Sequence, residues 1–177
     1  MRPARTCGLS ADNMDIVRIT VPGTLLYRDV VLRVVASVCR LRRIEAEATQ
    51  EPGRRNRVED FDDRVVSAVS EAFNNVAIHA YAGRRAEAKL ELRFELDRLT
   101  VQLLDTGDGF TLSAELGQDL ETLRESRMGL EIMLACMDEV TYVRGGPGTP
   151  NVLTMTKRYF AKAAASNCGD GAALVRA

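Results

Sequence analysis

A helical repeat of apolar residues over residues 60–82 constrains the fold of this chain more than any other feature. The members of the repeat are Val65, Val66, Val69, Phe73, Val76 and Ala80. Four polar residues, Ser67, Glu71, Asn75 and His79, follow at steps of four along the same stretch. Because a helix drifts by only about 40° over four residues, these side chains form one stripe beside the apolar face. The sequence therefore predicts an amphipathic helix with one face in a core.

The polar stripe has two interpretations. Polar residues at four-residue steps usually form a solvated helix face. The alternative is chemical, because the Glu71 carboxylate beside the Asn75 amide pairs a proton acceptor with a neutral oxygen ligand for a hard cation. The helix by itself leaves both interpretations open.

A second signal is the segment Asp-Thr-Gly-Asp-Gly-Phe over residues 105–110, which follows an apolar strand predicted over residues 99–105. Asp105 ends the row of core side chains on this strand, so its carboxylate requires a partner. Such a buried acceptor suits an exocyclic amine, for example that of adenine, while Gly107 and Gly109 let the backbone approach a flat ring or a phosphate. The same residue types also make ordinary turns, so the segment alone does not separate a binding loop from a simple turn.

A third signal is Gly129, at the start of a helix predicted over residues 128–137. A helix N-terminus offers free amide donors and the positive end of the helix dipole, which suit a phosphate group. A glycine at an ordinary helix start is the alternative interpretation.

Periodicity and turn residues divide the rest of the chain into short elements. A further helix is predicted over residues 25–43, and residues 45–59 and 111–126 are predicted loops, the second with a short helix over 113–122. Strands are predicted over residues 16–22, 86–96, 99–105, 140–144 and 152–160.

The chain is long enough for one core. With 177 residues and 46% hydrophobic side chains, we expect a single domain over residues 16–160, a disordered lead over 1–15 and a flexible tail over 161–177.

The composition excludes several partner classes. A formal net charge of −1 predicts no broad attraction to nucleic acid or to an anionic membrane. The four cysteines lie far apart, which indicates reduced thiols. No run approaches 18 apolar residues, so we expect a soluble, cytoplasmic protein without direct nucleic-acid or membrane contact.

The order of these motifs resembles the GHKL ATP-binding fold of gyrase-like ATPases and histidine kinases, and in particular the bacterial anti-sigma-factor serine/threonine kinases. The resemblance implies an α+β fold of the Bergerat type, a two-layer α/β sandwich whose mixed, mainly antiparallel sheet carries helices on one face. The motifs that carry the resemblance lie at residues 71–81, 105–110, 128–133, 137–140 and 153–157.

The resemblance also implies roles for single residues. Asn75 matches the Mg²⁺ ligand that joins the metal to the triphosphate, and Glu71 matches the general base that takes a proton from a substrate hydroxyl. Asp105 matches the adenine-binding aspartate, with Gly107 and Gly109 lining the base pocket. Two further nucleotide contacts are implied at the phosphate-binding turn and in the last strand, by Gly129 and Thr154.

The chain departs from the family pattern at two positions. Arg127 stands where the family has the first glycine of its second glycine motif; it either obstructs the phosphate or places a guanidinium on the γ-phosphate. The family's Gly-Thr before the last strand is altered in residues 148–151, where threonine is followed by Pro and Asn. His79, the sole histidine, lies in the predicted helix that carries Glu71 and Asn75 rather than on a separate phosphoacceptor helix. Histidine autophosphorylation is therefore not expected.

By resemblance, the leading hypothesis is an ATP- and Mg²⁺-dependent serine/threonine kinase. It would act as a homodimeric anti-sigma factor that phosphorylates an anti-anti-sigma partner and binds a sigma factor in alternation. The alternatives are a nucleotide-responsive binding module with little or no phosphotransfer, which Arg127 favours, and a general ATPase without a protein substrate.

Overall fold

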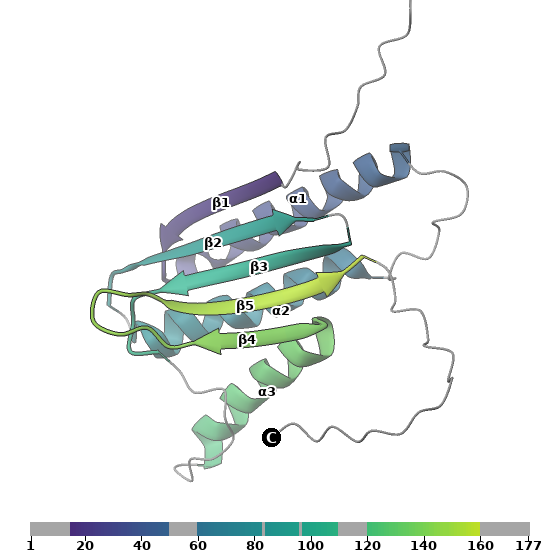
Figure 1. Ribbon diagram of the computed structural model, residues 1–177. Coiled ribbons are helices and arrows are strands. Elements are labelled where there is room, and N and C mark those ends of the chain that lie inside the picture. Colours follow the sequence, from purple (N-terminus) through teal and green to yellow (C-terminus); the bar gives the residue numbers. More distant parts are fainter. Residues whose placement is uncertain (1–14, 50–59, 83, 96, 110–119, 160–177) are drawn as a thin grey trace, which may run out of the picture.

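The computed structural model describes residues 15–49, 60–82, 84–95, 97–109 and 120–159 (Figure 1). The predicted tail, the predicted lead before Asp15 and most of the predicted loop over 111–126 lie outside these residues. The domain boundaries proposed from sequence therefore stay predictions.

Five strands form one sheet in the order β1-β2-β3-β5-β4. Each neighbouring pair is antiparallel. The strands are β1 Asp15–Pro22, β2 Glu87–Phe94, β3 Arg98–Asp105, β4 Glu139–Val143 and β5 Asn151–Arg158. The prediction of a mainly antiparallel sheet is confirmed, and the described pairs include no parallel one.

The helices lie against one face of this sheet. Helices α1 (Arg28–Thr49) and α2 (Phe61–Asn74) cross behind the strands, and α3 (Leu120–Cys136) packs beside α2 near the β4 edge (Figure 1). A short 3₁₀ turn, η1 (Leu25–Tyr27), precedes α1, and a π-helical segment, η2 (Asn75–Ala80), continues α2. The predicted two-layer α+β architecture is confirmed.

The core lies between the two layers, and both predicted periodicities contribute to it. On β3, residues alternate between buried and half-buried, and the buried row ends at Asp105 as predicted. On α2, the apolar side chains that repeat at helical spacing, among them Val65, Val69 and Phe73, are fully buried. Sheet and helix therefore present complementary apolar faces, which is the main source of stability in such a domain.

Two helices differ from their predicted lengths. Helix α1 continues to Thr49, because Glu and Ala in residues 45–49 are strong helix formers. Helix α3 begins at Leu120 rather than near Gly129. Val30 and Leu41 belong to the apolar repeat of α1 but are exposed, so the apolar face of α1 is wider than its packing partners cover.

Among the described residues, no helix is both long and apolar enough to cross a membrane.

Candidate functional site

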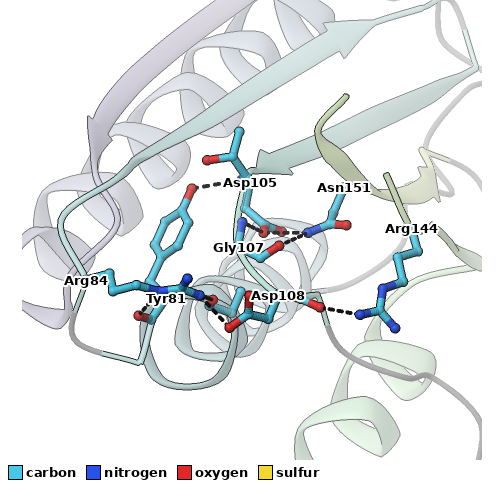
Figure 2. A network of polar contacts seen from close by, with 9 residues as sticks. Tyr81, Arg84, Asp105, Gly107, Asp108, Arg144 and Asn151 are labelled. Carbon is cyan, nitrogen blue, oxygen red and sulfur yellow. Dashed lines mark hydrogen bonds and ion pairs between the residues drawn. The ribbon is translucent and has the colours of Figure 1, made fainter. Parts of the chain in front are cut away.

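Asp105 and Asn151 form a buried pair at one end of the sheet. Asp105 is the last residue of β3 and is 2% exposed, and Asn151 is the first residue of β5. The Asn151 amide donates to Asp105 Oδ1 at 2.8 Å, and the backbone N–H of Gly107 donates to the same oxygen at 2.9 Å (Figure 2). The carboxylate predicted to need a partner therefore has two.

The turn after Asp105 packs directly on the end of η2. The backbone N–H of Asp108 donates to the carbonyl of Ala80 at 3.0 Å. A Cβ atom added to Gly107 would stand 2.3 Å from that carbonyl oxygen, so the turn approaches the helix this closely only with glycine. The sequence predicted that the backbone at Gly107 lies close to a ligand. In the structure it lies close to the backbone of Ala80 in η2.

Two arginines hold the same turn from opposite sides. Arg84 forms a 2.5 Å ion pair with the Asp108 carboxylate and donates to the Ala80 carbonyl at 3.0 Å. Arg144, which follows β4, donates to the Asp108 carbonyl at 2.7 Å (Figure 2). Gly109 comes next with a φ of 75°, a left-handed conformation that favours glycine. The turn is thus fixed before any ligand arrives.

Tyr81 ties the end of η2 to the turn and to β2. Its buried hydroxyl donates to the Glu87 carbonyl at 2.6 Å and accepts from the backbone N–H of Thr106 at 3.1 Å. A Cβ atom on Gly23 would come within 2.2 Å of the Tyr81 ring. The end of η2, the start of β2 and the turn after Asp105 are therefore packed as one unit.

The polar stripe on α2 and η2 is most buried at its third residue, Asn75, and is half-buried again at His79. Ser67 is exposed, Glu71 is half-buried, and Asn75 is only 8% exposed. The interpretation as a solvated face therefore does not hold at Asn75. The π-helical segment begins at this residue, and the N–H of Tyr81 bonds to the carbonyl of Val76, five residues earlier. Single π-helical turns inside α-helices are frequent at functional sites.

Gly129 brings α3 against this stripe. A Cβ atom on Gly129 would lie 3.1 Å from Glu71 Oε2 and 3.9 Å from Asn75 Oδ1. The expectation that a helix begins at Gly129 is wrong, because helix-forming residues before it continue α3 back to Leu120. Its backbone N–H therefore lies within a helix rather than among the free donors at a helix start.

The structure brings most of the predicted site residues into two adjoining groups. Glu71, Asn75 and Gly129 form one group, and the other contains Asp105, Gly107 and Gly109; η2 joins them. Thr154 belongs to neither. It lies on the open face of β5 and accepts from Gln102 at 3.3 Å, while Asp105 and Asn151 point to the helix side. The side chain of Arg127 lies outside the described residues.

Sequence reasoning missed Asn151, Tyr81, Arg84 and Arg144. The one local signal was the altered segment before the last strand, which contains Asn151. Their partners are distant or are backbone atoms, and no residue pattern encodes such contacts.

The donor set of the first group fits a magnesium-bound nucleotide. The Asn75 amide oxygen is a hard ligand of the kind Mg²⁺ takes when it arrives with phosphates, and the Glu71 carboxylate, one helical turn earlier, is a proton acceptor beside it. A Cβ atom at Gly129 would crowd Glu71 Oε2 at 3.1 Å, so glycine leaves this carboxylate oxygen uncovered on the α3 side. The buried acceptor Asp105 adds a recognition group for a base.

Comparison with known proteins gives matches over most of this region. The family described as histidine kinase-like ATPase domain matches residues 22–157. The chain is 32% identical over 122 residues to a serine-protein kinase RsbW from Staphylococcus aureus, an alignment covering 63% of this chain and 74% of the relative. RsbW from strain MRSA252 is 31% identical with the same coverage.

Proposed function

Because the chain belongs to the histidine kinase-like ATPase family, and within it to the anti-sigma-factor serine/threonine kinases, we propose that it transfers the γ-phosphoryl group of ATP to a partner protein. The acceptor is a serine or threonine hydroxyl on an anti-anti-sigma protein. The protein binds a sigma factor when that partner is absent or phosphorylated. It acts as a homodimer in the cytoplasm. Its kinase domain comprises residues 16–160.

The observation that carries this proposal is the adjoining position of the two groups. Glu71 and Asn75 face Gly129 on one side of η2, and the turn after Asp105 packs on the other end of the same segment. An adenine nucleotide with its base at Asp105 and its phosphates toward Asn75 would lie along η2. This arrangement supports ATP as the ligand.

Each residue then has one task. Asp105 accepts a hydrogen bond from the amino group of the base, and Gly109 adjoins the base pocket. The Asn75 amide oxygen ligates Mg²⁺, and the Glu71 carboxylate accepts the proton of the substrate hydroxyl. Bound MgATP supplies the phosphoryl group and a cation that neutralises the charge developing on it. Positioning by rigid elements accounts for most of the catalysis in such reactions.

The test is phosphate transfer from γ-labelled ATP with Mg²⁺ to a purified anti-anti-sigma domain protein encoded beside this chain. Label should appear on a serine or threonine of that protein. Glu71→Gln should lower kcat by roughly 100-fold or more with little change in ATP affinity, because it removes the base and leaves the binding site. Asn75→Ala should weaken MgATP binding as well.

Ser67→Ala is the matched control, since Ser67 lies on the same stripe one turn before Glu71 but is exposed. It should transfer phosphate at the native rate. Native-level labelling by Glu71→Gln would remove the proposed base, and a folded native protein without affinity for MgATP or MgADP would remove the whole proposal.

A second candidate is a nucleotide-responsive binding module that sequesters its partner with little phosphotransfer. The position of Gly129 inside α3 favours it, because a phosphate there meets no free helix N-terminus. The same experiment separates the two: tight ATP binding and partner capture without label would favour the module.

A further inference from the structure

The Asn151 side chain is fully engaged at the base end of the site. It is 3% exposed. Its Nδ2 donates to Asp105 Oδ1 at 2.8 Å and to the Gly107 carbonyl at 3.1 Å (Figure 2). Its Oδ1 accepts from the Gly145 N–H at 2.9 Å. If the amide were flipped, its oxygen would face the Asp105 carboxylate and the Gly107 carbonyl, which are both acceptors. Its NH₂ group would face the Gly145 N–H, which is a donor. These partners therefore permit a single amide orientation.

The orientation of Asn151 is supported by the hairpin that carries it. Gly145 and Asn151 lie at the two ends of the connection between β4 and β5. A Cβ atom on Gly145 would come within 2.2 Å of the Thr149 carbonyl oxygen, so this connection is closely packed. The Asn151 amide is thus held by backbone groups at both ends, the Gly145 N–H at its oxygen and the Gly107 carbonyl at its nitrogen.

The consequence for Asp105 is an asymmetric carboxylate. Within the described residues, both donors to Asp105, the Asn151 amide and the Gly107 N–H, converge on Oδ1. This leaves Oδ2 to accept from a ligand. Without Asn151 the carboxylate would lose one of the two hydrogen bonds that fix its rotation about χ2, and the only one from a side chain among the described residues.

We propose that Asn151 is the positioning residue that sets base selectivity, by holding Asp105 so that Oδ2 accepts the 6-amino group of adenine. This inference rests on the proposed function, since it requires an adenine nucleotide at Asp105. A 6-oxo purine directs an oxygen at the same carboxylate and is repelled. A purine without any 6-substituent loses one charged hydrogen bond.

The experiment measures the affinities of two nucleotides for native and variant protein by calorimetry in the presence of Mg²⁺. It compares ADP with purine riboside diphosphate, which lacks only the 6-amino group, on native protein and on Asn151→Asp. The native protein should prefer ADP by roughly 10- to 100-fold, the range of one charged hydrogen bond. Asn151→Asp retains the acceptor for Gly145 but loses the donor to Asp105. At about pH 8 it should prefer ADP by less than about threefold, mostly through weaker ADP binding.

The pH dependence of the ADP preference distinguishes a positioning role of Asn151 from a purely structural one. Two carboxyl groups at hydrogen-bond distance share one proton when the pH falls, and the shared proton restores a donor between positions 105 and 151. The ADP preference of Asn151→Asp, relative to native protein at the same pH, should recover towards about pH 5.5. Asn151→Ala, which adds no charge and so guards against misfolding of the first variant, should lose the preference without recovering it.

Thr156→Val is the matched control, because Thr156 lies on the open face of the same strand. It should retain the native ADP preference. Retention of that preference in Asn151→Asp and Asn151→Ala would overturn the inference while leaving the kinase proposal intact. A native protein that binds both diphosphates equally would do the same, and one that binds neither would remove both proposals.

Discussion

Gly129 of α3 lies against Glu71 of α2 so closely that a Cβ atom on the glycine would stand 3.1 Å from Glu71 Oε2. The proposed base is therefore held between two helices. An atom added at Gly129 acts on the position of the carboxylate rather than on the core. A substitution at Gly129 should therefore affect the free energy of unfolding and the rate of phosphotransfer in different ways.

Gly129→Ala should uncouple these two properties. Alanine favours a helix interior by about 1 kcal/mol over glycine, and the atom it approaches is the mobile end of a side chain. The free energy of unfolding should stay unchanged or rise by up to about 1 kcal/mol. Displacement of the Glu71 carboxylate should lower kcat of phosphotransfer by roughly 10- to 100-fold. Urea unfolding and the labelling assay measure the two quantities.

Glu131→Ala is the control for this pair of measurements, because Glu131 is exposed on the same helix. It should leave kcat at the native value. A Gly129→Ala protein with native kcat would show that the position of Glu71 tolerates the added methyl group.

Gly107→Ala should destabilise the protein, because its Cβ would meet the Ala80 carbonyl oxygen at 2.3 Å and backbone cannot yield as a side chain does. We expect a loss of about 2–3 kcal/mol in the free energy of unfolding. Gly146→Ala is the matched control, since the nearest atom to its Cβ is Thr149 Oγ1 at 3.7 Å. Chemical denaturation of both variants tests this, and equal losses would contradict the close approach at Gly107.

Tyr81→Phe removes a hydroxyl that bonds both the Glu87 carbonyl and the Thr106 N–H. These partly buried backbone groups would lose their partner, which should cost about 1–3 kcal/mol in the free energy of unfolding. Because Thr106 follows Asp105, affinity for MgADP should fall too. Tyr27→Phe at the protein surface is the control and should change neither quantity. Native ADP affinity in Tyr81→Phe would separate the hydroxyl from the base site.

Glu91 on β2 should contribute stability that depends on pH. The Arg93 guanidinium at 2.5 Å, followed by Arg18 at 2.7 Å, lowers the pKa of this carboxyl. A folded-state pKa below the unfolded value gives stability that is present above the unfolded value and lost as pH falls through the folded one. Glu91→Gln should therefore cost less than about 1 kcal/mol at neutral pH, the range of surface ion pairs, and the difference should vanish in acid.

Denaturation curves of native and Glu91→Gln protein between neutral pH and about pH 3 check this prediction. Glu87→Gln, on the same strand and exposed, is the control and should give a smaller difference at neutral pH. A Glu91→Gln deficit that grows as the pH falls would have the wrong sign.

The sequence alone determined most of the elements and, on α2 and β3, their buried faces. The repeat on α2 and the alternation on β3 predicted which side chains are buried, including Asp105. Such patterns are readable because each is one local geometry repeated along the chain, so many residues report the same fact. Glu71 and Asn75 were chosen on the same ground, since helical spacing alone places them on one stripe.

Only the tertiary structure decided how these elements meet. The bond between Asn151 and Asp105 joins residues 46 positions apart, and the bond from the Asp108 N–H to the Ala80 carbonyl joins the turn after β3 to the end of η2. The approach of Gly129 to Glu71 depended on how α3 packs against α2. Each is a single contact or a single register, and a single contact leaves no periodic trace in the sequence.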